Sequence, residues 1–255
     1  MTNLRQRMLY FITPSVGERV APADLARIVE QAIRGGAGLV QWRQKPSAAD
    51  LQANQQLQRE WESSTSASTS GSNARPFLLD IAKEIRHITK QYDVPFIVND
   101  SLELALEIDA DGVHVGQTDA TLTQLQQKLR AEGKDLIIGV TVRDGIQAKA
   151  ACEGGATYLG AGPVFTSSTK PNANDGKTIG IEGLRECTRV AQQFNVPVYA
   201  IGGLSLKDRS IQRCIKEGEA AGVSVIAAIG GAADVEAAAA AINSELVKIA
   251  QAPQH

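Results

Sequence analysis

The feature that most constrains the fold is a regular alternation along the chain between short apolar runs and longer segments with helical spacing. Eight runs have the length and the β-branched or aromatic content of strands, and they begin at Leu9, Leu39, Phe96, Gly112, Ile137, Tyr158, Val198 and Gly222. A strand–helix unit repeated eight times predicts a closed parallel sheet surrounded by helices. The sequence therefore predicts an α/β protein, a single (β/α)8 TIM barrel over residues 1–255, with a doubly wound open sheet as the competing architecture.

The segments between the runs have the spacing of amphipathic helices. Between the first two runs, five apolar residues repeat at i, i+3, i+4, i+7 and i+8, which places them on one stripe: Leu25, Ile28, Val29, Ala32 and Ile33. Further helices are expected over residues 76–92 and 233–251, and a short one after the third run. Ser205, with Asp208 three residues later, resembles a capping box that opens another helix.

One segment departs from this alternation. Residues 63–72 read SSTSASTSGS, a polar low-complexity stretch with nothing to bury. It interrupts the second helical region and is too short to separate two domains. We expect a flexible Ser/Thr-rich surface insertion at about residues 63–75, with no specific role.

Composition and charge exclude several classes of function. The chain has 255 residues, of which 43% are hydrophobic and 21% are charged, and its formal net charge is -2. The hydrophobic content suits a globular enzyme, and the charge balance provides no basic field for nucleic acid. The N-terminal sequence lacks the apolar core of a signal peptide, and no apolar run reaches the ~20 residues that span a bilayer. We therefore expect no nucleic-acid or membrane partner, and a cytoplasmic location.

The cysteines and histidines do not form a recognisable metal or catalytic motif. Cys152, Cys187 and Cys214 are widely spaced within helix-like segments, so we interpret them as free thiols. The histidines are His87, His114 and His255, and the last lies in the tail. A three-histidine zinc site or a Ser-His-Asp triad is therefore not expected. His114 lies within the fourth run and is interpreted as a core or supporting residue.

Functional groups in a parallel barrel collect where the strands end, and the second run ends in cations. The sequence QWRQK places Gln41, Arg43 and Lys45 at i, i+2 and i+4, so all three project to one face of an extended segment. Two converging cations suit a polyanion. Taken alone, the same pattern also fits two long side chains that simply extend into solvent at a strand end.

The third and fourth runs are followed by carboxylates. Asn99 and Asp100 end the third run, and Asp119 follows the fourth. Adjacent strands lie about 4.8 Å apart, so the two carboxylates can approach one hard cation, and Mg2+ typically takes one or two carboxylates together with phosphate oxygens. The sequence predicts Mg2+ bound by Asp100 and Asp119, although each aspartate could instead cap the helix that follows it.

The later strand ends carry hydroxyls, a lysine and glycines. Thr141 follows the fifth run, which alone is a weak signal. The loop after the sixth run contains hydroxyl residues and then a lysine, a combination that predicts an anion cradle: Thr166, Ser167, Ser168, Thr169 and Lys170. Gly202 and Gly203 end the seventh run and would let a ligand approach the backbone. The loops after the last two strands of such barrels often bind phosphate.

The ordered motifs QWRQK, VNDSLELALEIDADGVHVGQTD, GPVFTSSTK and AIGG resemble those of the thiamine-phosphate synthase family, from about Tyr10 to Ile229. Members of that family are (β/α)8 barrels, commonly homodimeric. They are transferases that join a hydroxymethylpyrimidine diphosphate to a thiazole phosphate or its carboxylated form and release pyrophosphate. The resemblance implies the same reaction and the same two small-molecule substrates here.

The resemblance also implies roles for individual residues. Those matching the pyrimidine diphosphate site are Gln41, Arg43, Lys45, Asn99, Thr141 and Lys170, of which Arg43, Lys45, Thr141 and Lys170 would be catalytic. Asp100 and Asp119 match the Mg2+ ligands. Those matching the thiazole phosphate site are Ser167, Ser168, Thr169, Gly203, Ile226 and Ala227. Three positions depart from the family pattern: Thr141 stands for serine, Ser167 for threonine and Ala227 for serine, and only Ala227 lacks a hydroxyl.

Two alternatives remain at this stage. A thiazole tautomerase of the same superfamily would use a histidine as acid or base, but Pro163 occupies the matching position. A barrel that binds phosphorylated ligands without catalysis would have little need for Arg43, Lys45, both aspartates and Lys170 together. We expect a mechanism in which diphosphate leaves first and the thiazole nitrogen captures the resulting pyrimidine cation, with positive charge as the protein's main contribution.

Overall fold

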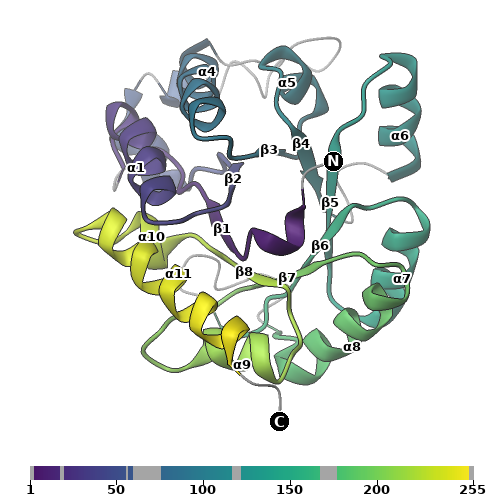
Figure 1. The fold of residues 1–255 in the computed structure, drawn as a ribbon. Coiled ribbons are helices and arrows are strands. Elements are labelled where there is room, and N and C mark those ends of the chain that lie inside the picture. The colour runs from purple at the N-terminus through teal and green to yellow at the C-terminus, as the bar shows by residue number, and fades with distance from the viewer. Residues whose placement is uncertain are drawn as a thin grey trace.

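The computed structural model describes residues 3–17, 20–55, 57–59, 76–116, 122–166 and 177–252. Eight parallel strands follow one another around a closed barrel in the order β1-β2-β3-β4-β5-β6-β7-β8 (Figure 1). The (β/α)8 barrel is therefore confirmed, and the open doubly wound sheet is wrong. The expected insertion at residues 63–75 lies outside the described residues.

Every run that was expected to be a strand forms one. The strands are β1 Leu9–Ile12, β2 Leu39–Trp42, β3 Phe96–Asn99, β4 Gly112–Val115, β5 Ile137–Val142, β6 Tyr158–Ala161, β7 Val198–Ile201 and β8 Gly222–Val225. The register pairs Ile12 with Gln41 and Asn99 with His114. The polar residues at these strand ends therefore lie at similar heights in the barrel.

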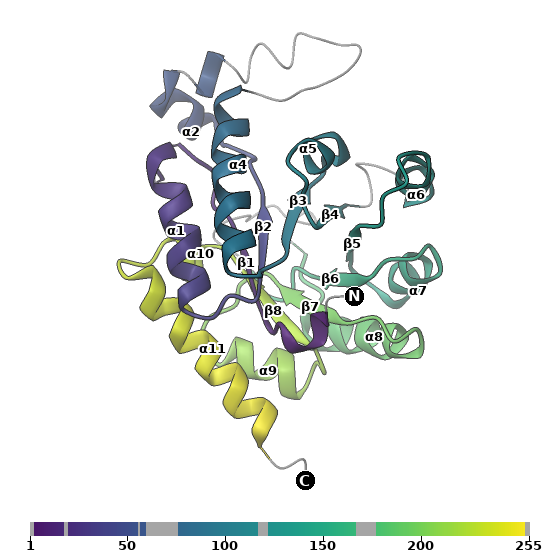
Figure 2. The same cartoon turned by 45° about the horizontal axis from the view of Figure 1, so that its top comes forward.

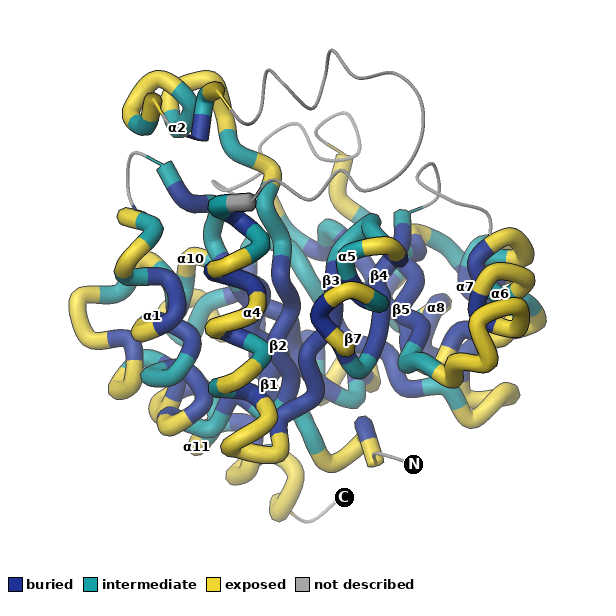
Figure 3. Tube along the Cα trace, turned by 90° about the horizontal axis from the view of Figure 1, so that it is seen from above, coloured by how far each residue is buried: buried dark blue, intermediate teal, exposed yellow. Residues whose placement is uncertain are grey.

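The helices surround the barrel (Figure 2). They are α1 Pro22–Arg34, α2 Ala48–Ala53, α4 Pro76–Gln91, α5 Leu102–Glu107, α6 Leu122–Ala131, α7 Gly145–Glu153, α8 Gly180–Gln193, α9 Ser210–Lys216, α10 Ala227–Gly230 and α11 Val235–Gln251. The five apolar residues of the predicted stripe in α1 are all buried. Along the chain, buried strands alternate with helices that expose their outer face (Figure 3).

One predicted helix start is wrong. Ser205 and Asp208 do not open a helix, because α9 begins at Ser210 and is preceded by Arg209 in the left-handed conformation (φ 59°). The Asp208 carboxylate accepts hydrogen bonds from the Ser205 hydroxyl (2.9 Å) and the Ser210 amide (3.0 Å). The Ser210 hydroxyl in turn accepts from the Ser205 amide (2.7 Å). These contacts close a turn, and the Ser-x-x-Asp spacing serves that turn instead of a cap.

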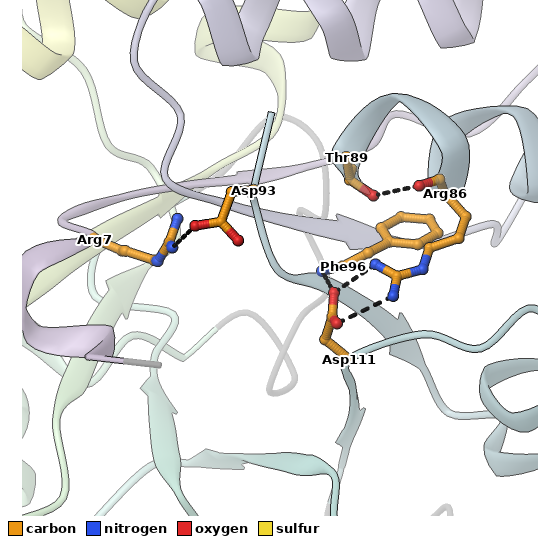
Figure 4. A network of polar contacts seen from close by, with 6 residues as sticks. All are labelled: Arg7, Arg86, Thr89, Asp93, Phe96 and Asp111. Carbon is orange, nitrogen blue, oxygen red and sulfur yellow. Dashed lines mark hydrogen bonds and ion pairs between the residues drawn. The ribbon is translucent and has the colours of Figure 1, made fainter. Parts of the chain in front are cut away.

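The N-terminal end of the barrel is closed by side chains and by the 3-10 helix η1 (Leu4–Gln6). The Tyr199 hydroxyl, inside the barrel, donates to the carbonyls of Leu4 (2.7 Å) and Arg7 (3.1 Å). At the same end, Arg86 forms a two-point ion pair with Asp111 (2.7 and 3.1 Å), whose carboxylate also accepts from the Phe96 amide (2.8 Å; Figure 4). These contacts fasten α4 and β3 to the turn before β4, away from the strand ends that carry the predicted site.

The three cysteines agree with the expectation from the sequence. Cys152, Cys187 and Cys214 are buried and unpaired with one another, as expected of free thiols. No helix within the described ranges is both long enough and apolar enough to cross a membrane.

Candidate active site

A cavity of about 1350 Å³ opens at the C-terminal ends of β1, β2 and β8. Its lining includes Thr13 after β1, Arg43 and Lys45 after β2, and Ile226 and Ala227 after β8. The structure therefore brings together residues predicted for the diphosphate and for the thiazole phosphate. The cavity also extends outward between the N-terminal turns of α1 and α11.

Lys45 and Asp100 meet above the barrel from neighbouring strands. The Lys45 ammonium forms an ion pair with the Asp100 carboxylate, which also accepts a hydrogen bond from the Asn99 side-chain amide. Asp100 has a left-handed backbone (φ 64°), and its amide donates to the His114 carbonyl (2.9 Å). This backbone conformation turns the chain at the end of β3. Asn99, Asp100 and Lys45 therefore form one cluster, which brings together residues predicted for the diphosphate and for the metal.

Asp100 is not the cap of the following helix. The N-cap of α5 is Ser101, whose hydroxyl accepts a hydrogen bond from the Leu104 amide (3.1 Å). The capping interpretation of Asp100 is therefore wrong, and its carboxylate is directed to Lys45 and Asn99 instead.

Arg43 is held by its backbone, in contacts that the sequence did not predict. The buried Thr13 hydroxyl accepts from the Arg43 amide (2.9 Å) and donates to the Arg43 carbonyl (3.3 Å). The Gln44 side chain accepts from the Val16 amide (2.9 Å) and donates to the Pro14 carbonyl (3.1 Å). These contacts, here called the β1–β2 clasp, join the loops after the two strands. One sequence signal could have indicated the role of Gln44. It lies between Arg43 and Lys45, so in an extended segment its side chain projects to the opposite face from theirs.

The environment of Arg43 combines burial with a nearby carboxylate. Desolvation lowers the pKa of Arg43, and the negative charge of Asp100 raises it. A guanidinium stays charged at physiological pH even after such a shift. Arg43 therefore brings a partly desolvated positive charge to the same cluster as Lys45, where its attraction for an anion is stronger than in open water.

Gln41 and Thr141 lie at the two ends of a buried hydrogen-bonded chain. Gln41 donates to the Tyr10 hydroxyl (2.7 Å), which lies 2.7 Å from the Tyr158 hydroxyl. His114 contacts Tyr158 through Nδ1 (2.9 Å) and Thr141 through Nε2 (2.8 Å). We call these five residues the polar relay. His114 is buried and hydrogen-bonded, which agrees with its interpretation as a core or supporting residue, whereas the two tyrosines were missed because each lies in an ordinary apolar run.

Gly202 and Gly203 are required by the neighbouring loop. Both have positive φ (101° and 65°), and a Cβ atom on Gly203 would lie 2.3 Å from the Thr166 carbonyl oxygen. The Gly202 carbonyl accepts from the Phe165 amide (3.1 Å). The two glycines therefore allow the loop after β6 to pack closely against the end of β7. Their role in ligand approach stays a prediction.

Several predicted residues lie outside the described part of the chain: Asp119, Ser167, Ser168, Thr169 and Lys170. Within the described ranges, no three His, Cys, Asp or Glu side chains gather closely enough to hold a metal ion. Asp100 is the one predicted metal ligand that the described residues include. Its carboxylate supplies the hard oxygen that Mg2+ requires, so the donor present fits this ion.

Comparison with known proteins identifies the family. The family model described as thiamine monophosphate synthase matches residues 9–229. The chain belongs to the thiamine monophosphate synthase family. A thiamine-phosphate synthase of Geobacillus thermodenitrificans is 36% identical over 94% of this chain and 92% of that protein. One from Bacillus thuringiensis subsp. konkukian is 36% identical over 87% of this chain and 84% of that protein.

Comparison with solved structures indicates the same family. The thiamine phosphate pyrophosphorylase of Pyrococcus furiosus superimposes with a TM-score of 0.71 at 31% identity, covering 97% of this chain and 99% of that one. The 3-hexulose-6-phosphate synthase structure, at 15% identity and a TM-score of 0.59, shares the fold alone. The resemblance read from the motifs is therefore confirmed, and so are the transferase class and the thiamine-phosphate synthase activity that it implied.

Proposed function

We propose that this chain condenses 4-amino-2-methyl-5-(diphosphooxymethyl)pyrimidine with 4-methyl-5-(2-phosphoethyl)thiazole to give thiamine phosphate and pyrophosphate. The carboxylated form of the thiazole would give the same products together with CO2. The observation that carries the proposal is that Arg43 and Lys45 line the large cavity, and that Lys45 is ion-paired there with Asp100, whose carboxylate also accepts from Asn99. Two cations beside a carboxylate support a site for a diphosphate, with Asp100 as a proposed ligand of a metal ion.

The cations would act on the leaving group. In the proposed reaction the bond between the pyrimidine methylene carbon and the diphosphate oxygen breaks, and its electron pair leaves with the diphosphate. Arg43, Lys45 and Lys170 would stabilise the negative charge that develops on that oxygen. The β1–β2 clasp would keep Arg43 in place before the substrate arrives, so that little reorganisation is needed.

Asp100 and Asp119 would hold Mg2+. When bound, this ion would neutralise diphosphate oxygens as a Lewis acid and orient the leaving group. The Asp100 carboxylate is already fixed by Asn99 and by its own left-handed backbone, so its direction depends little on the ion. Lys45, paired with the same carboxylate, would remain close enough to contact the diphosphate.

The second substrate would complete the bond. Gln41 and Thr141 would hold the aminopyrimidine ring over the barrel interior, and the thiazole nitrogen would supply the electron pair that captures the methylene carbon. Holding the two rings together removes much of the entropic cost of a bimolecular step. The protein needs no nucleophile and no strong base in this scheme.

The thiazole phosphate would lie between the loops after β6, β7 and β8. Its predicted contacts are Ser167, Ser168, Thr169, Gly203, Ile226 and Ala227. Ala227 is the first residue of α10, and Ile226 precedes it with an irregular backbone (φ -114°, ψ -80°). A backbone amide at this position would bind phosphate without the hydroxyl that the family usually carries.

Two further features belong to the proposal. We expect a cytoplasmic homodimer, because the family is commonly dimeric and its substrates are small phosphorylated metabolites. Light scattering of the purified protein and fractionation of cells that express it would test these two expectations.

The decisive experiment is to incubate the purified protein with both substrates and Mg2+ and to measure pyrophosphate. Stoichiometric release with thiamine phosphate supports the proposal. Isomerisation of the thiazole without pyrophosphate would indicate a tautomerase, and binding without turnover would indicate a non-catalytic barrel. Pro163 is a poor tautomerase residue, since it has no titratable group and its carbonyl accepts from the Ile179 amide (2.8 Å).

A further inference from the structure

Beyond the ends of β1 and β2, side-chain hydroxyls take the place of main-chain carbonyls in the pairing of the two segments. The main-chain pairing ends where the Thr13 amide donates to the Gln41 carbonyl (2.9 Å). The Thr13 hydroxyl then accepts from the Arg43 amide (2.9 Å). Two residues further on, the Ser15 hydroxyl accepts from the Lys45 amide (3.0 Å). Two hydroxyls are therefore matched, in order, to the two cations predicted for the diphosphate.

The two hydroxyls differ in where their hydrogens can be donated. Thr13 is buried, and its hydroxyl donates back to the Arg43 carbonyl (3.3 Å). Ser15 is half-buried and lines the large cavity together with Arg43 and Lys45. Among the residues that the structure describes, the Ser15 hydroxyl has one hydrogen-bond partner, the Lys45 amide, and that partner is a donor. The hydrogen of Ser15 is therefore available to an acceptor in the cavity, whereas that of Thr13 is not.

The backbone of Ser15 is fixed on both sides along the chain. The Pro14 carbonyl accepts from the Gln44 side chain (3.1 Å), and the Val16 amide donates to the same side chain (2.9 Å). The Val16 side chain is fully buried in the core. Since the Lys45 amide holds the oxygen of Ser15 as well, the hydroxyl is in place before a ligand arrives. Little conformational freedom would be lost when it binds one.

The charges around Ser15 favour an anionic acceptor for its hydrogen. Arg43 and Lys45 line the same cavity, and burial leaves the Arg43 guanidinium partly desolvated. A hydroxyl that donates to an ionised phosphate oxygen makes a short, charge-assisted hydrogen bond, which is roughly twice as strong as one between neutral groups. The ammonium of Lys45 attracts an anion as a point charge, whereas a hydroxyl donates along one direction. Ser15 would therefore add orientation to the attraction that the cations supply.

We propose that Ser15 is a further substrate-binding residue, whose hydroxyl donates to a diphosphate oxygen while its own oxygen accepts from the Lys45 amide. The proposal rests on the proposed function for the identity of the ligand. The diphosphate is favoured over the thiazole phosphate because Ser15 is bonded to the segment after β2, whereas the predicted thiazole phosphate contacts follow β6, β7 and β8. The contact is made to the substrate and to released pyrophosphate alike, so it acts on KM more than on kcat.

Ser15→Ala tests this contact, and Ser47→Ala is its matched control. Both serines line the cavity, and the Ser47 hydroxyl also accepts from a backbone amide, that of Asp50 (3.2 Å). The Ser47 hydroxyl, however, donates to the Asp50 carboxylate (2.8 Å), so its hydrogen is already used within the protein. Calorimetric titration with inorganic pyrophosphate, at a fixed excess of Mg2+, measures a dissociation constant for each variant without any turnover.

The two variants should differ clearly in this titration. We expect Ser15→Ala to raise the dissociation constant of pyrophosphate roughly tenfold, because a hydrogen bond to a charged group is lost, and Ser47→Ala to leave it unchanged. Equal constants in Ser15→Ala and the unaltered protein would overturn the proposal. An equal loss of affinity in both variants would show that any change at the cavity wall weakens binding, and it would overturn the proposal as well.

The same hydroxyl supports the backbone of Lys45, and a double-mutant cycle separates this support from a contact with the ligand. The quantity compared is kcat/KM for the pyrimidine diphosphate in Lys45→Met, with and without Ser15→Ala. A hydroxyl that contacts the diphosphate itself still contributes when the ammonium is absent, so we expect a further loss of roughly tenfold. If Ser15→Ala has no effect in Lys45→Met, the serine acts only through Lys45, and the proposed contact is wrong.

These measurements also separate a failure of the Ser15 contact from a failure of the proposed function. If the unaltered protein forms thiamine phosphate while Ser15→Ala binds pyrophosphate normally, the function stands and the contact is wrong. If the unaltered protein neither binds pyrophosphate with Mg2+ nor releases it from the two substrates, both are wrong. Titration with the thiazole phosphate completes the test, and Ser15→Ala should leave its dissociation constant unchanged. A greater loss of affinity for the thiazole phosphate than for pyrophosphate would place the hydroxyl at the other phosphate and overturn the proposal.

Discussion

The Lys45 ammonium contacts the Asp100 carboxylate across the ends of β2 and β3, so the predicted phosphate contact and the predicted metal ligand belong to one cluster. The Asn99 side-chain amide donates to the same carboxylate oxygen, Oδ2. Since the backbone of Asp100 is left-handed, its carboxylate leaves the strand in a direction that a right-handed residue would not reproduce. Residue 100 therefore combines two properties, a carboxylate charge and a left-handed backbone conformation.

Asp100→Asn separates these requirements, because asparagine also tolerates the left-handed conformation. We expect normal folding and a loss of kcat/KM of roughly a hundredfold, since one charged contact to the metal and leaving group is lost. Asp109→Asn is the control: Asp109 is also left-handed (φ 53°) and paired with a lysine (3.8 Å), but at the opposite end of the barrel. Near-normal turnover in Asp100→Asn at saturating Mg2+ would refute the metal role.

The β1–β2 clasp predicts that Thr13 matters for activity although it is buried. Thr13→Val keeps the shape and removes the hydroxyl that serves both the amide and the carbonyl of Arg43. We expect unfolding free energy to fall by about 1 to 3 kcal/mol and KM for the pyrimidine diphosphate to rise. Thr188→Val is the control. It removes an equally buried hydroxyl, which lies in α8 and donates to the Gly218 carbonyl (2.9 Å), outside the β1–β2 clasp. An identical rise in KM in both variants would argue against positioning of Arg43.

The sequence predicts the strands and part of the site because both depend on local patterns. Alternation along an extended chain predicted that Arg43 and Lys45 project together, and both line the cavity, while the apolar runs marked all eight strands. The relay could not be predicted, since Tyr10 and Tyr158 are 148 residues apart and meet only after the barrel closes. The turn at Ser205 was misread because a three-residue Ser-Asp spacing suits a cap and a turn equally.

The ion pair at the other end of the barrel is expected to affect stability alone. Asp111→Ala removes a carboxylate that binds Arg86 at two points and the Phe96 amide (Figure 4). Since both side chains are partly exposed, we expect a loss of about 2 kcal/mol in the free energy of unfolding with unchanged kcat. Asp93→Asn removes the charge of the exposed partner of Arg7 (3.6 Å) and tolerates the left-handed backbone of this residue (φ 51°), so it should leave the denaturation midpoint unchanged. A drop in kcat for Asp111→Ala would show coupling between the two ends.

The buried thiols predict a loss of stability at alkaline pH. Burial raises the pKa of Cys187 and of Cys214 from 9.0 to about 12. Below pH 9 the thiols are protonated in both the folded and the unfolded chain, so their contribution to stability is constant. Between pH 9 and 12 the thiols ionise in the unfolded chain while they stay protonated in the folded protein. The free energy of unfolding therefore falls as pH rises through this range. Each thiol contributes at most about 1.4 kcal/mol per pH unit. Urea unfolding from pH 8 to 11 should show a shallower decline for Cys214→Ala than for the unaltered protein, and parallel curves would contradict the assignment.

Gly203 offers a test of whether the loop after β6 must sit close to β7 for catalysis. Alanine at this position meets two obstacles: a left-handed backbone (φ 65°), and a Cβ atom 2.3 Å from the Thr166 carbonyl oxygen. Gly133→Ala meets the first obstacle alone, because Gly133 has φ 61° and no heavy atom within 4 Å of its added Cβ. Gly133→Ala should therefore cost about 1 to 2 kcal/mol of stability and no activity.

Gly203→Ala should cost at least as much stability and, in addition, displace Thr166 and the residues that follow it, which include the predicted phosphate contacts. We expect KM for the thiazole phosphate to rise by at least tenfold while the affinity for the pyrimidine diphosphate changes less, because Arg43, Lys45 and Asp100 lie on other loops. Steady-state kinetics with each substrate varied in turn measures the two effects separately. Equal changes for both substrates, or for both glycine variants, would mean that backbone strain alone explains the result and that the seating of this loop has no part in thiazole binding.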